Sequence, residues 1–294
     1  MFMSKKIETH ILTFSCEDQI GIVAKISSIL AKFSCNIVES KQFTDTLTGN
    51  FFIRQSFVLF DKTKIDDLKS SLNLLSSDLK GVFLLSEIDI RMDTVLLVSR
   101  FDHCLNDLLF RVRNNSLNIN IKAIISNHEV ARKIAEFSNI PFHYLPVDKN
   151  NKVQQEQKIK KILYDNNIEL IVLARYMQVL SESFANEFAG KIINIHHSFL
   201  PSFKGAKPYH QAFERGVKVI GATAHYVTKE LDEGPIIEQD TQEVDHEMMP
   251  DDLISIGRDI ESRVLYRALK AHSEKRVFLN GKRTIVFKGH RKVV

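Results

Sequence analysis

The chain has 294 residues, and 44% of them are apolar, which is enough to build a hydrophobic core in each of two domains. Its 40 basic and 36 acidic residues leave a net charge of +4, too small and too evenly spread to indicate binding to nucleic acid or an anionic membrane. Three widely spaced cysteines without a CxxC pair argue against a disulfide framework and a thiolate zinc site. The sequence shows no signal-peptide pattern and no run of about 18 apolar residues, so it predicts a cytoplasmic protein.

Residues 1–91 predict a small α+β domain with the ferredoxin-like order βαββαβ. The alternation of apolar residues predicts strands at 7–16, 36–45, 51–60 and 82–90, and helices at 22–34 and 65–79. Asp18 and Gly21 are suitable turn and capping residues before the first helix. This order places two helices on one face of an antiparallel sheet.

Residues 92–294 change to strands that alternate with helices, which is typical of a doubly wound, mostly parallel α/β sheet. Strands are expected at 94–99, 119–126, 142–147, 170–176 and 192–197, and helices at 105–115, 129–138, 153–167 and 181–190. A strand pair around Gly234 and Pro235 follows. The chain then ends with a long helix at about 251–273 and a hairpin.

Three segments in this second domain combine apolar residues with isolated polar ones: 173–181, 194–210 and 222–235. Each follows or ends a predicted strand, and open α/β sheets bind ligands beyond the carboxyl ends of their strands. Asn194 and His196 are two residues apart, so their side chains share one face of a strand. The amide can stabilise an oxyanion, the imidazole can exchange protons, and Asp232 can orient His196 or hold a water. No serine or cysteine nucleophile is evident, so water or a substrate amine is expected to attack an acyl group directly.

At these residues the chain resembles the folate-dependent formyltransferase fold of glycinamide ribonucleotide transformylases, methionyl-tRNA formyltransferases and formyltetrahydrofolate deformylases. The shared motifs are NIHxSFLP at 194–201 and HYVTxELDxGP at 225–235. The resemblance implies that Asn194, His196 and Asp232 are the catalytic residues. It also implies a folate pocket lined by Leu173, Tyr176, Met177, Gln178, Val179, Leu180, Tyr226, Val227 and Leu231.

Two departures within this fold resemble the deformylases rather than the ribonucleotide enzymes. The stretch 99–109 has no glycine and carries Asp102, so it would hold a substrate phosphate poorly. His197 stands where the ribonucleotide enzymes have proline, and the run GAKPYHQAFERG follows. The resemblance implies hydrolysis of 10-formyltetrahydrofolate to formate and tetrahydrofolate, in one-carbon and purine metabolism. It implies no metal and no diffusible cofactor.

The deformylases also have an N-terminal ACT domain of order βαββαβ, which matches the first predicted domain. ACT domains bind effectors, often amino acids, near the first β to α turn and the start of the second strand. The resemblance therefore implies an effector site, with methionine or glycine as the expected ligand and a symmetric homo-oligomer as the expected assembly. The residues that this resemblance assigns to the effector site are Asp18, Gln19, Gly21, Ile22, Val23 and Asn36.

Several alternatives stay open from the sequence. His197 and His225 are candidates for catalytic support, but neighbouring histidines also simply hydrogen-bond loops. With His196 and Asp232 they offer the residue types of a zinc site, although no HExxH spacing occurs. The 173–181 segment can be ordinary core. For the whole chain, the competing functions are formyl transfer to an amine acceptor and a non-catalytic sensor that binds folate and an amino acid.

Overall fold

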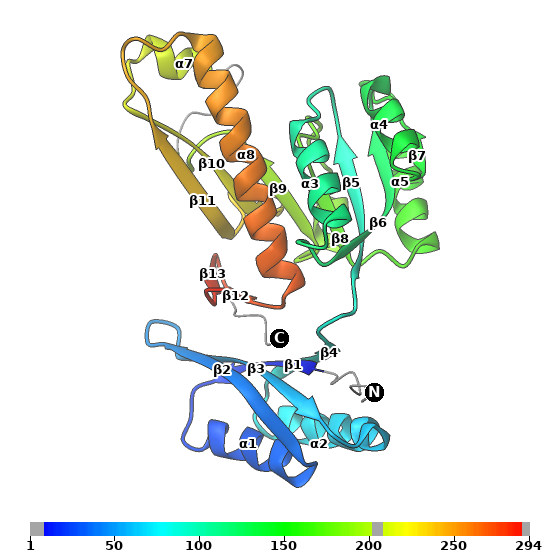
Figure 1. Ribbon diagram of the computed structural model, residues 1–294, viewed down its shortest axis with the longest axis vertical. Helices are drawn as coiled ribbons and strands as arrows, with labels where there is room; N and C mark the ends of the chain where they lie inside the picture. Colours follow the sequence, from blue (N-terminus) through cyan, green and yellow to red (C-terminus); the bar gives the residue numbers. More distant parts are fainter. Residues whose placement is uncertain (1–8, 202–207, 290–294) are drawn as a thin grey trace, which may run out of the picture. The chain divides into compact units, whose positions relative to one another are not determined.

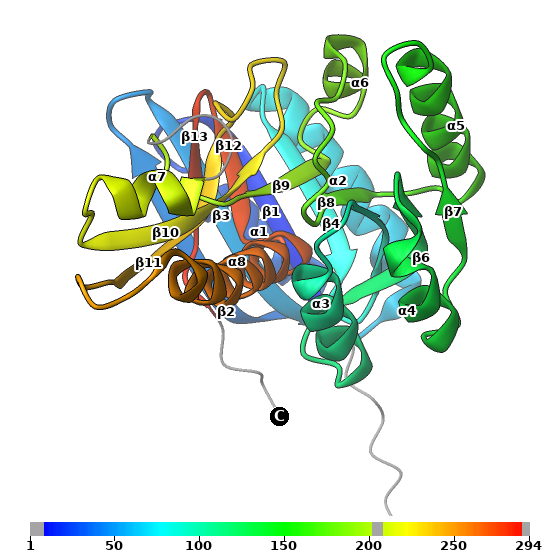
Figure 2. The same cartoon turned by 90° about the horizontal axis from the view of Figure 1, so that it is seen from above.

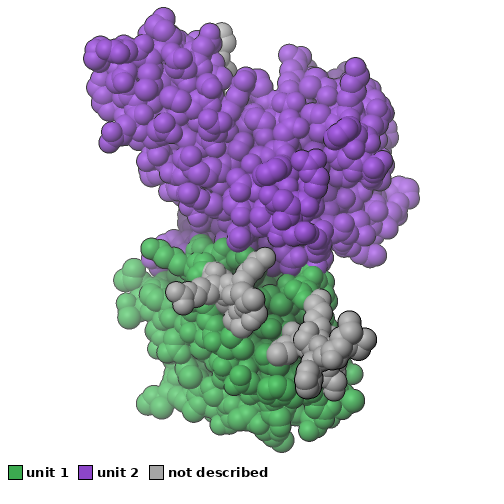
Figure 3. All heavy atoms as spheres, in the orientation of Figure 1, with its two compact units in different colours: residues 1–90, 274–280, 285–294 green, residues 91–273, 281–284 purple. Residues whose placement is uncertain are grey.

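A computed structural model of the chain describes residues 9–201 and 208–289 and contains two compact units (Figures 1 and 3). The first unit comprises Met1–Ile90, Glu274–Asn280 and Ile285–Val294, and the second comprises Arg91–Ser273 and Gly281–Thr284. Within the described residues, no helix is both long enough and apolar enough to span a membrane.

The first unit is a four-stranded antiparallel sheet with two helices on one face. Its elements are β1 (Thr9–Glu17), α1 (Ile22–Lys32), β2 (Cys35–Asp45), β3 (Asn50–Leu59), the short 3-10 helix η1 (Lys62–Lys64), α2 (Ile65–Asp78) and β4 (Val82–Glu87). The strand order is β2-β3-β1-β4. Leu12 and Phe14 of β1 pack against Ile26 of α1 and Leu72 of α2 in one buried core, and this confirms the predicted βαββαβ arrangement.

The C-terminal segment packs on the other face of this sheet. Phe52 and Arg54 alternate along β3 with the core residue Ile53, so they point away from the helices. The ring of Phe52 lies edge-on to Phe278 at a centroid distance of 5.5 Å, and Arg54 Nε donates to the carbonyl of Glu274 at 3.1 Å. This segment was predicted to belong to the second domain, but it lies in the first unit, because a hairpin pattern does not show which sheet it covers.

That segment forms the hairpin β12 (Val277–Asn280) and β13 (Arg283–Val286). The buried amide of Asn280 at its turn donates to Asp45 Oδ2 at 2.6 Å and to Thr48 Oγ1 at 3.2 Å. A buried carboxylate needs such donors, so this contact fixes the hairpin to the β2–β3 turn.

The second unit is built on a seven-stranded sheet of order β11-β10-β9-β8-β5-β6-β7. Its strands are β5 (Met92–Val98), β6 (Ile119–Ser126), β7 (Phe142–Tyr144), β8 (Leu170–Leu173), β9 (Ile192–His196), β10 (Val219–Tyr226) and β11 (Ile236–Glu243). Its helices are α3 (His103–Arg113), η2 (Glu129–Ala131), α4 (Arg132–Phe137), α5 (Lys152–Asp165), α6 (Glu182–Glu187), α7 (Pro208–Glu214) and α8 (Pro250–Ser273). Strands β5 to β9 are parallel, whereas β10 runs antiparallel to both β9 and β11.

Helices cover both faces of this sheet, with α5 and α6 on one side and α3 and α8 on the other (Figure 2). Leu96 and Leu97 are neighbours on β5 that point to opposite faces, and both are fully buried. This explains why the strands of the second domain are apolar along their whole length instead of alternating.

Two predicted elements differ from the structure for local reasons. Strand β8 ends at Leu173 rather than at residue 176, because Arg175 has a φ of 65°, which a strand does not accommodate. The helix predicted at 129–138 divides into η2 and α4. Helix α7, which the sequence analysis does not predict, follows the part of the 194–210 segment that lies outside the described residues.

Candidate active site

A cavity of about 260 Å³ lies at the carboxyl ends of β8 and β9. The segment after β8 supplies one wall, the end of β9 supplies the floor, and the loop after β10 supplies the opposite wall. Its lining residues are Leu173, Arg175, Tyr176, Met177, Gln178, Val179, Leu180, Asn194, Ile195, His196, His197, His225, Val227, Thr228, Lys229, Glu230, Leu231 and Asp232. The cavity therefore unites residues from the three segments that the sequence analysis selects.

The 222–235 segment, which contains the end of β10 and the loop after it, does not reach the cavity as the end of a parallel strand. Because β10 is antiparallel to β9, its C-terminal end points away from the carboxyl edge of the parallel strands, and His225 lies opposite Asn194. The loop after Tyr226 returns along the sheet and brings Asp232 to His196. The 222–235 segment was predicted to follow a third parallel strand, and this is wrong, because strand direction cannot be read from an apolar pattern.

One residue predicted for the folate pocket does not line the cavity. Tyr226 is buried, and its hydroxyl lies 2.7 Å from Nδ1 of His272 on α8. The other eight predicted pocket residues do line it. Tyr226 therefore faces the helix layer, because adjacent strand residues point to opposite faces and His225 faces the cavity.

The four polar groups of the site form a connected set. Nδ1 of His225 lies 2.9 Å from the carbonyl of Tyr226, and because a carbonyl only accepts, this nitrogen carries the proton. Nε2 of His225 then accepts from the amide of Asn194 at 3.2 Å. Asp232 Oδ1 lies 3.4 Å from His196 Nδ1 and 3.7 Å from His225 Nε2. One N–H of the Asn194 amide is thus fixed, and the second is left for a substrate oxygen.

Asp232 is held in an unusual backbone conformation. Its φ is 58°, in the left-handed region that few non-glycine residues adopt. Two residues later, a Cβ on Gly234 would lie 1.7 Å from the carbonyl oxygen of Tyr226, so only glycine lets the loop approach β10 this closely. The backbone N–H of Tyr226 donates to Pro235 at 2.9 Å and closes the loop. The geometry of this loop therefore sets the position of Asp232.

The charge of Asp232 is stabilised by its neighbours. Burial on its own would raise the pKa of this carboxyl, but its close contacts with the imidazoles of His196 and His225 outweigh burial and hold its pKa well below the ordinary value of 3.8. Asp232 is therefore ionised at neutral pH. The same contact orients His196, whose buried Nε2 has no hydrogen-bond partner among the described residues and stays available to a ligand.

His197 also lines the cavity, and its ring centroid lies 4.9 Å from that of His196. Burial, and then the positive charges of Arg175 and His196, lower the pKa of His197 to about 4. Its imidazole is therefore neutral near pH 7 and can accept a hydrogen bond.

Similarity to known proteins agrees with this geometry. Residues 92–269 match the formyl transferase family, and residues 10–76 match the ACT domain family. The chain is 46% identical over 287 residues to the formyltetrahydrofolate deformylase of Corynebacterium sp. (strain P-1), a match that covers 97% of this chain and 100% of that protein. The chain belongs to the formyltetrahydrofolate deformylase family.

Other members of the family are similar over a comparable length. The formyltetrahydrofolate deformylase of Bacillus subtilis (strain 168) is 45% identical over 284 residues, covering 94% of this chain and 93% of that protein. The crystal structure of the formyltetrahydrofolate deformylase from Burkholderia mallei superposes with a TM-score of 0.93 at 43% identity, covering 96% of this chain and all of that one. The fold predicted from the sequence, an ACT domain followed by a formyltransferase-type sheet, is confirmed.

The residues predicted for an effector site fall into two groups in the first unit. Asp18, Gln19 and Val23 are exposed around the turn at Gly21, whose φ of 92° needs glycine. Ile22, in contrast, is buried in the core beneath α1, so its side chain faces the sheet rather than a ligand. The side chain of Ile22 is therefore not available to an effector, although its backbone directly follows Gly21.

Asn36 lies at the other end of the sheet from this turn. It pairs with Val58, which also pairs with Thr9 at the start of β1, whereas Glu17 at the end of β1 pairs with Asn50. Thr9 and Glu17, at the two ends of β1, are eight residues apart, which is roughly 26 Å at about 3.3 Å per residue. One copy of the chain therefore does not bring Asn36 to the same ligand as the turn around Gly21.

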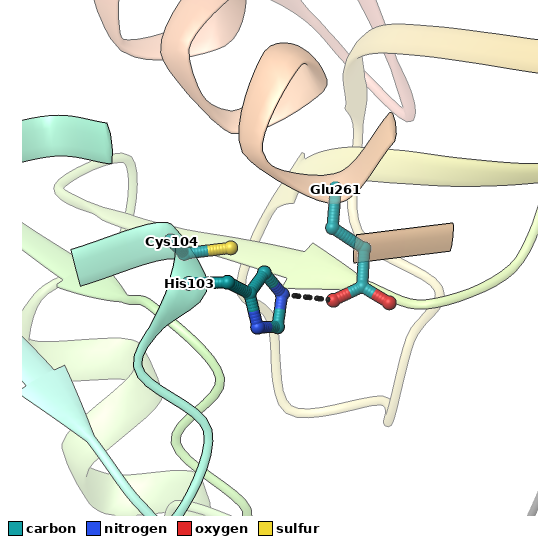
Figure 4. A group of neighbouring side chains, drawn as sticks. All are labelled: His103, Cys104 and Glu261. Carbon is teal, nitrogen blue, oxygen red and sulfur yellow. Dashed lines mark hydrogen bonds and ion pairs between the residues drawn. The ribbon is translucent and has the colours of Figure 1, made fainter. Parts of the chain in front are cut away.

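A second group of polar residues, which the sequence analysis does not select, lies close to the cavity. His103 and Cys104 on α3 approach Glu261 on α8, with the His103 ring directed at the carboxylate (Figure 4). Among the described residues, these are the ligand-type atoms near enough to share a metal ion, and the histidines that line the cavity do not form such a group. The zinc alternative for His196, His197, His225 and Asp232 is thus not supported by their arrangement. In the sequence, the charged residue Arg175 stands between apolar residues, and this pattern could have pointed to the group of His103, Cys104 and Glu261.

Part of the GAKPYHQAFERG run lies outside the described residues, which exclude 202–207. Asp102, expected to repel an anion, lies immediately before α3. The glycine-free stretch therefore leads into α3, whose first residue is the His103 that contacts Glu261.

Proposed function

We propose that this chain hydrolyses 10-formyltetrahydrofolate to formate and tetrahydrofolate, with Asn194, His196 and Asp232 as the catalytic residues. The observation that carries the proposal is the convergence of an amide, an imidazole and an ionised carboxylate on one cavity. The motifs and the deformylase relatives supply the substrate class. Hydrolysis of this one-carbon donor places the chain in one-carbon and purine metabolism.

In the proposed reaction, the free N–H of Asn194 and protonated His196 polarise the formyl oxygen. Asp232 balances the charge of His196 and positions a water, which adds to the formyl carbon. The tetrahedral intermediate then breaks its carbon–nitrogen bond, the folate nitrogen leaves with a proton, and formate is released. His225 supports the site by holding Asn194 through its Nε2. This route uses no metal and no diffusible cofactor.

The folate is proposed to bind in the cavity between the segment after β8 and the loop after β10. Met177, Val179 and Leu231 border it and are more than half exposed, so they offer apolar surface to a planar ligand. Behind this surface, Leu173 and Tyr176 are buried and Val227 is partly buried, and these three residues shape the cavity.

Regulation is proposed to act through the ACT domain, with methionine or glycine as the effector. Because the turn around Gly21 and Asn36 lie at opposite ends of one sheet, an effector that touches both needs two copies of the chain. A symmetric homo-oligomer satisfies this condition. Titration calorimetry of the full chain with each amino acid, together with sedimentation analysis, tests the two points separately.

The central experiment is incubation of the purified chain with 10-formyltetrahydrofolate alone. Stoichiometric formate and tetrahydrofolate are expected without any amine acceptor. Formyl transfer that requires an added amine would instead identify a transferase, and binding without turnover would identify a sensor. Asn194→Ala is expected to lower kcat by about 10²–10³-fold, the usual effect of removing one oxyanion donor.

A further inference from the structure

The segment after β8, which forms one wall of the cavity, begins as a continuation of the parallel pairing between β5 and β8. The backbone N–H of Ala174 donates to the carbonyl of Leu97 at 2.9 Å. The N–H of Ser99, the residue after β5, then donates to the carbonyl of Arg175 at 3.2 Å. Arg175 has a φ of 65°, so the strand conformation ends there. The backbone N–H groups that follow therefore need acceptors from outside the strand ladder.

The Ser99 hydroxyl supplies one of these acceptors. Its Oγ accepts from the backbone N–H of Met177 at 2.9 Å and donates to Oδ1 of Asn127 at 2.7 Å. A hydroxyl has a single proton, so donation to Asn127 leaves the lone pairs of Ser99 for Met177. Ser99 and Asn127 directly follow β5 and β6, and only 2% and 7% of their surfaces are exposed. The buried end of the parallel sheet therefore fixes the backbone of Met177.

The other end of the wall is held by a buried carboxylate. Glu156 on α5 accepts from the backbone N–H of Ser181 at 2.7 Å and also from its hydroxyl. Ser181 in turn caps α6, because its Oγ accepts from the N–H of Phe184. Residues 178–180 lie between Met177 and this second anchor, and all three line the cavity. The chain itself makes both anchors, so the wall is pre-organised, which lowers the cost of binding a ligand.

We propose that Ser99, oriented by Asn127, is a positioning residue for folate binding, which holds Met177 so that residues 177–180 form a fixed wall of the cavity. The inference rests on the proposed function and adds to it a residue that does not line the cavity and does not touch the substrate. The stretch 99–109 has no glycine to bring its backbone close to a phosphate. Its first side chain supports the folate wall instead.

The competing interpretation is that Ser99 only satisfies a backbone N–H, as serine side chains commonly do outside regular structure. Ser126, the last residue of β6, allows the two interpretations to be separated. It is buried, and its Oγ accepts from the N–H of His128 at 3.0 Å, but neither of these residues lines the cavity. The two serines thus have the same local role at neighbouring strand ends, and only Ser99 holds a residue of the cavity wall.

The first measurement is hydrogen exchange of the Met177 amide by NMR, on the full chain without folate. The wild-type amide is expected to be protected. Ser99→Ala removes its acceptor and should speed its exchange by about 10-fold. Asn127→Ala leaves the Ser99 hydroxyl in place without its partner and should speed exchange by about threefold, which keeps the inference testable if Ser99→Ala does not fold. Ser126→Ala is the matched control and should not change the exchange of Met177.

The second measurement is the affinity for tetrahydrofolate by calorimetry, with KM and kcat from formate release. Ser99→Ala should raise both Kd and KM by about 10-fold and keep kcat within about twofold, because binding is weakened and the reacting groups are unchanged. Asn127→Ala should change Kd and KM in the same direction by about threefold. The double variant should bind no more weakly than Ser99→Ala, because Asn127 acts through Ser99. Ser126→Ala should bind like the wild type.

Three results overturn the inference. They are an unprotected Met177 amide in the wild type, an unchanged Kd in Ser99→Ala, and a fall in kcat of Ser99→Ala at unchanged KM. A wild type that does not bind tetrahydrofolate refutes the proposed function, and the exchange rates still decide whether Ser99 holds the wall.

Discussion

Replacement of Asp232 by asparagine is the most direct test of the proposed chemistry, because it changes charge with almost no change in shape. In the wild type, Asp232 Oδ1 lies 3.4 Å from His196 Nδ1. The variant keeps a polar side chain at this position but cannot balance a positive charge on His196. We expect His196 to polarise the formyl oxygen much less effectively as a result.

The size of the effect follows from the distance. Two unit charges 3.4 Å apart attract by roughly 5 kcal/mol at an effective dielectric constant of about 20. The Asp232 side chain is 19% exposed, so water restores part of this stabilisation in the variant. A remaining loss of about 3–4 kcal/mol corresponds to a decrease of about 10²–10³-fold in kcat.

The assay is formate release from 10-formyltetrahydrofolate at pH 7.5, with kcat and KM determined separately. Asp240→Asn is the matched control, because Asp240 has a similarly exposed side chain at 24% and pairs with Arg263 and Arg267 rather than with the site. The control should keep wild-type kcat. If Asp232→Asn stays within about threefold of the wild type while it folds normally, the assigned role of Asp232 is wrong.

Three further predictions concern stability. Gly234→Ala should lower the free energy of unfolding by about 1–3 kcal/mol and reduce activity, because the added Cβ would overlap the Tyr226 carbonyl. Gly289→Ala is its control, because nothing lies within 4 Å of a Cβ at that position, and thermal melts should show no change in its stability. Asn280→Ala should cost about 1–3 kcal/mol in denaturant unfolding because buried Asp45 loses its 2.6 Å donor, and the exposed Leu279→Ala is its control. Because its folded pKa lies below 3.8, Asp232 contributes stability that is fully present above about pH 4 and is lost as the pH falls, so the melting temperatures of wild type and Asp232→Asn should converge in acid.

Much of the fold could be predicted from the sequence because its elements have strong local patterns. The predicted strands and helices of the first unit match β1 to β4, α1 and α2 to within a few residues. The apolar runs at 119–126 and 192–197 became β6 and β9. The β8 boundary was less predictable, since the local apolar pattern does not indicate the left-handed conformation of Arg175.

The residues that line the candidate site were predictable in part for the same reason. Asn194 and His196 share a strand face, and the cavity contains both, as expected. Tyr226 was assigned to the pocket because it lies within a matching motif, but it points to His272 on the opposite layer. Glu261 gave no signal, because it is one of several acidic residues in a long amphipathic helix, and such residues normally face solvent.

By itself, the sequence determined the order of elements and selected the side chains proposed for the chemistry, because both depend on neighbouring residues and short motifs. Only the tertiary structure decided which groups act on one another. The antiparallel direction of β10 decides how Asp232 reaches His196, and the position of α8 beside the segment after β8 decides that Glu261 forms an ion pair with Arg175. These contacts join residues between about 36 and 86 positions apart in the chain, and they depend on strand direction and helix packing, which local hydrophobic patterns do not encode.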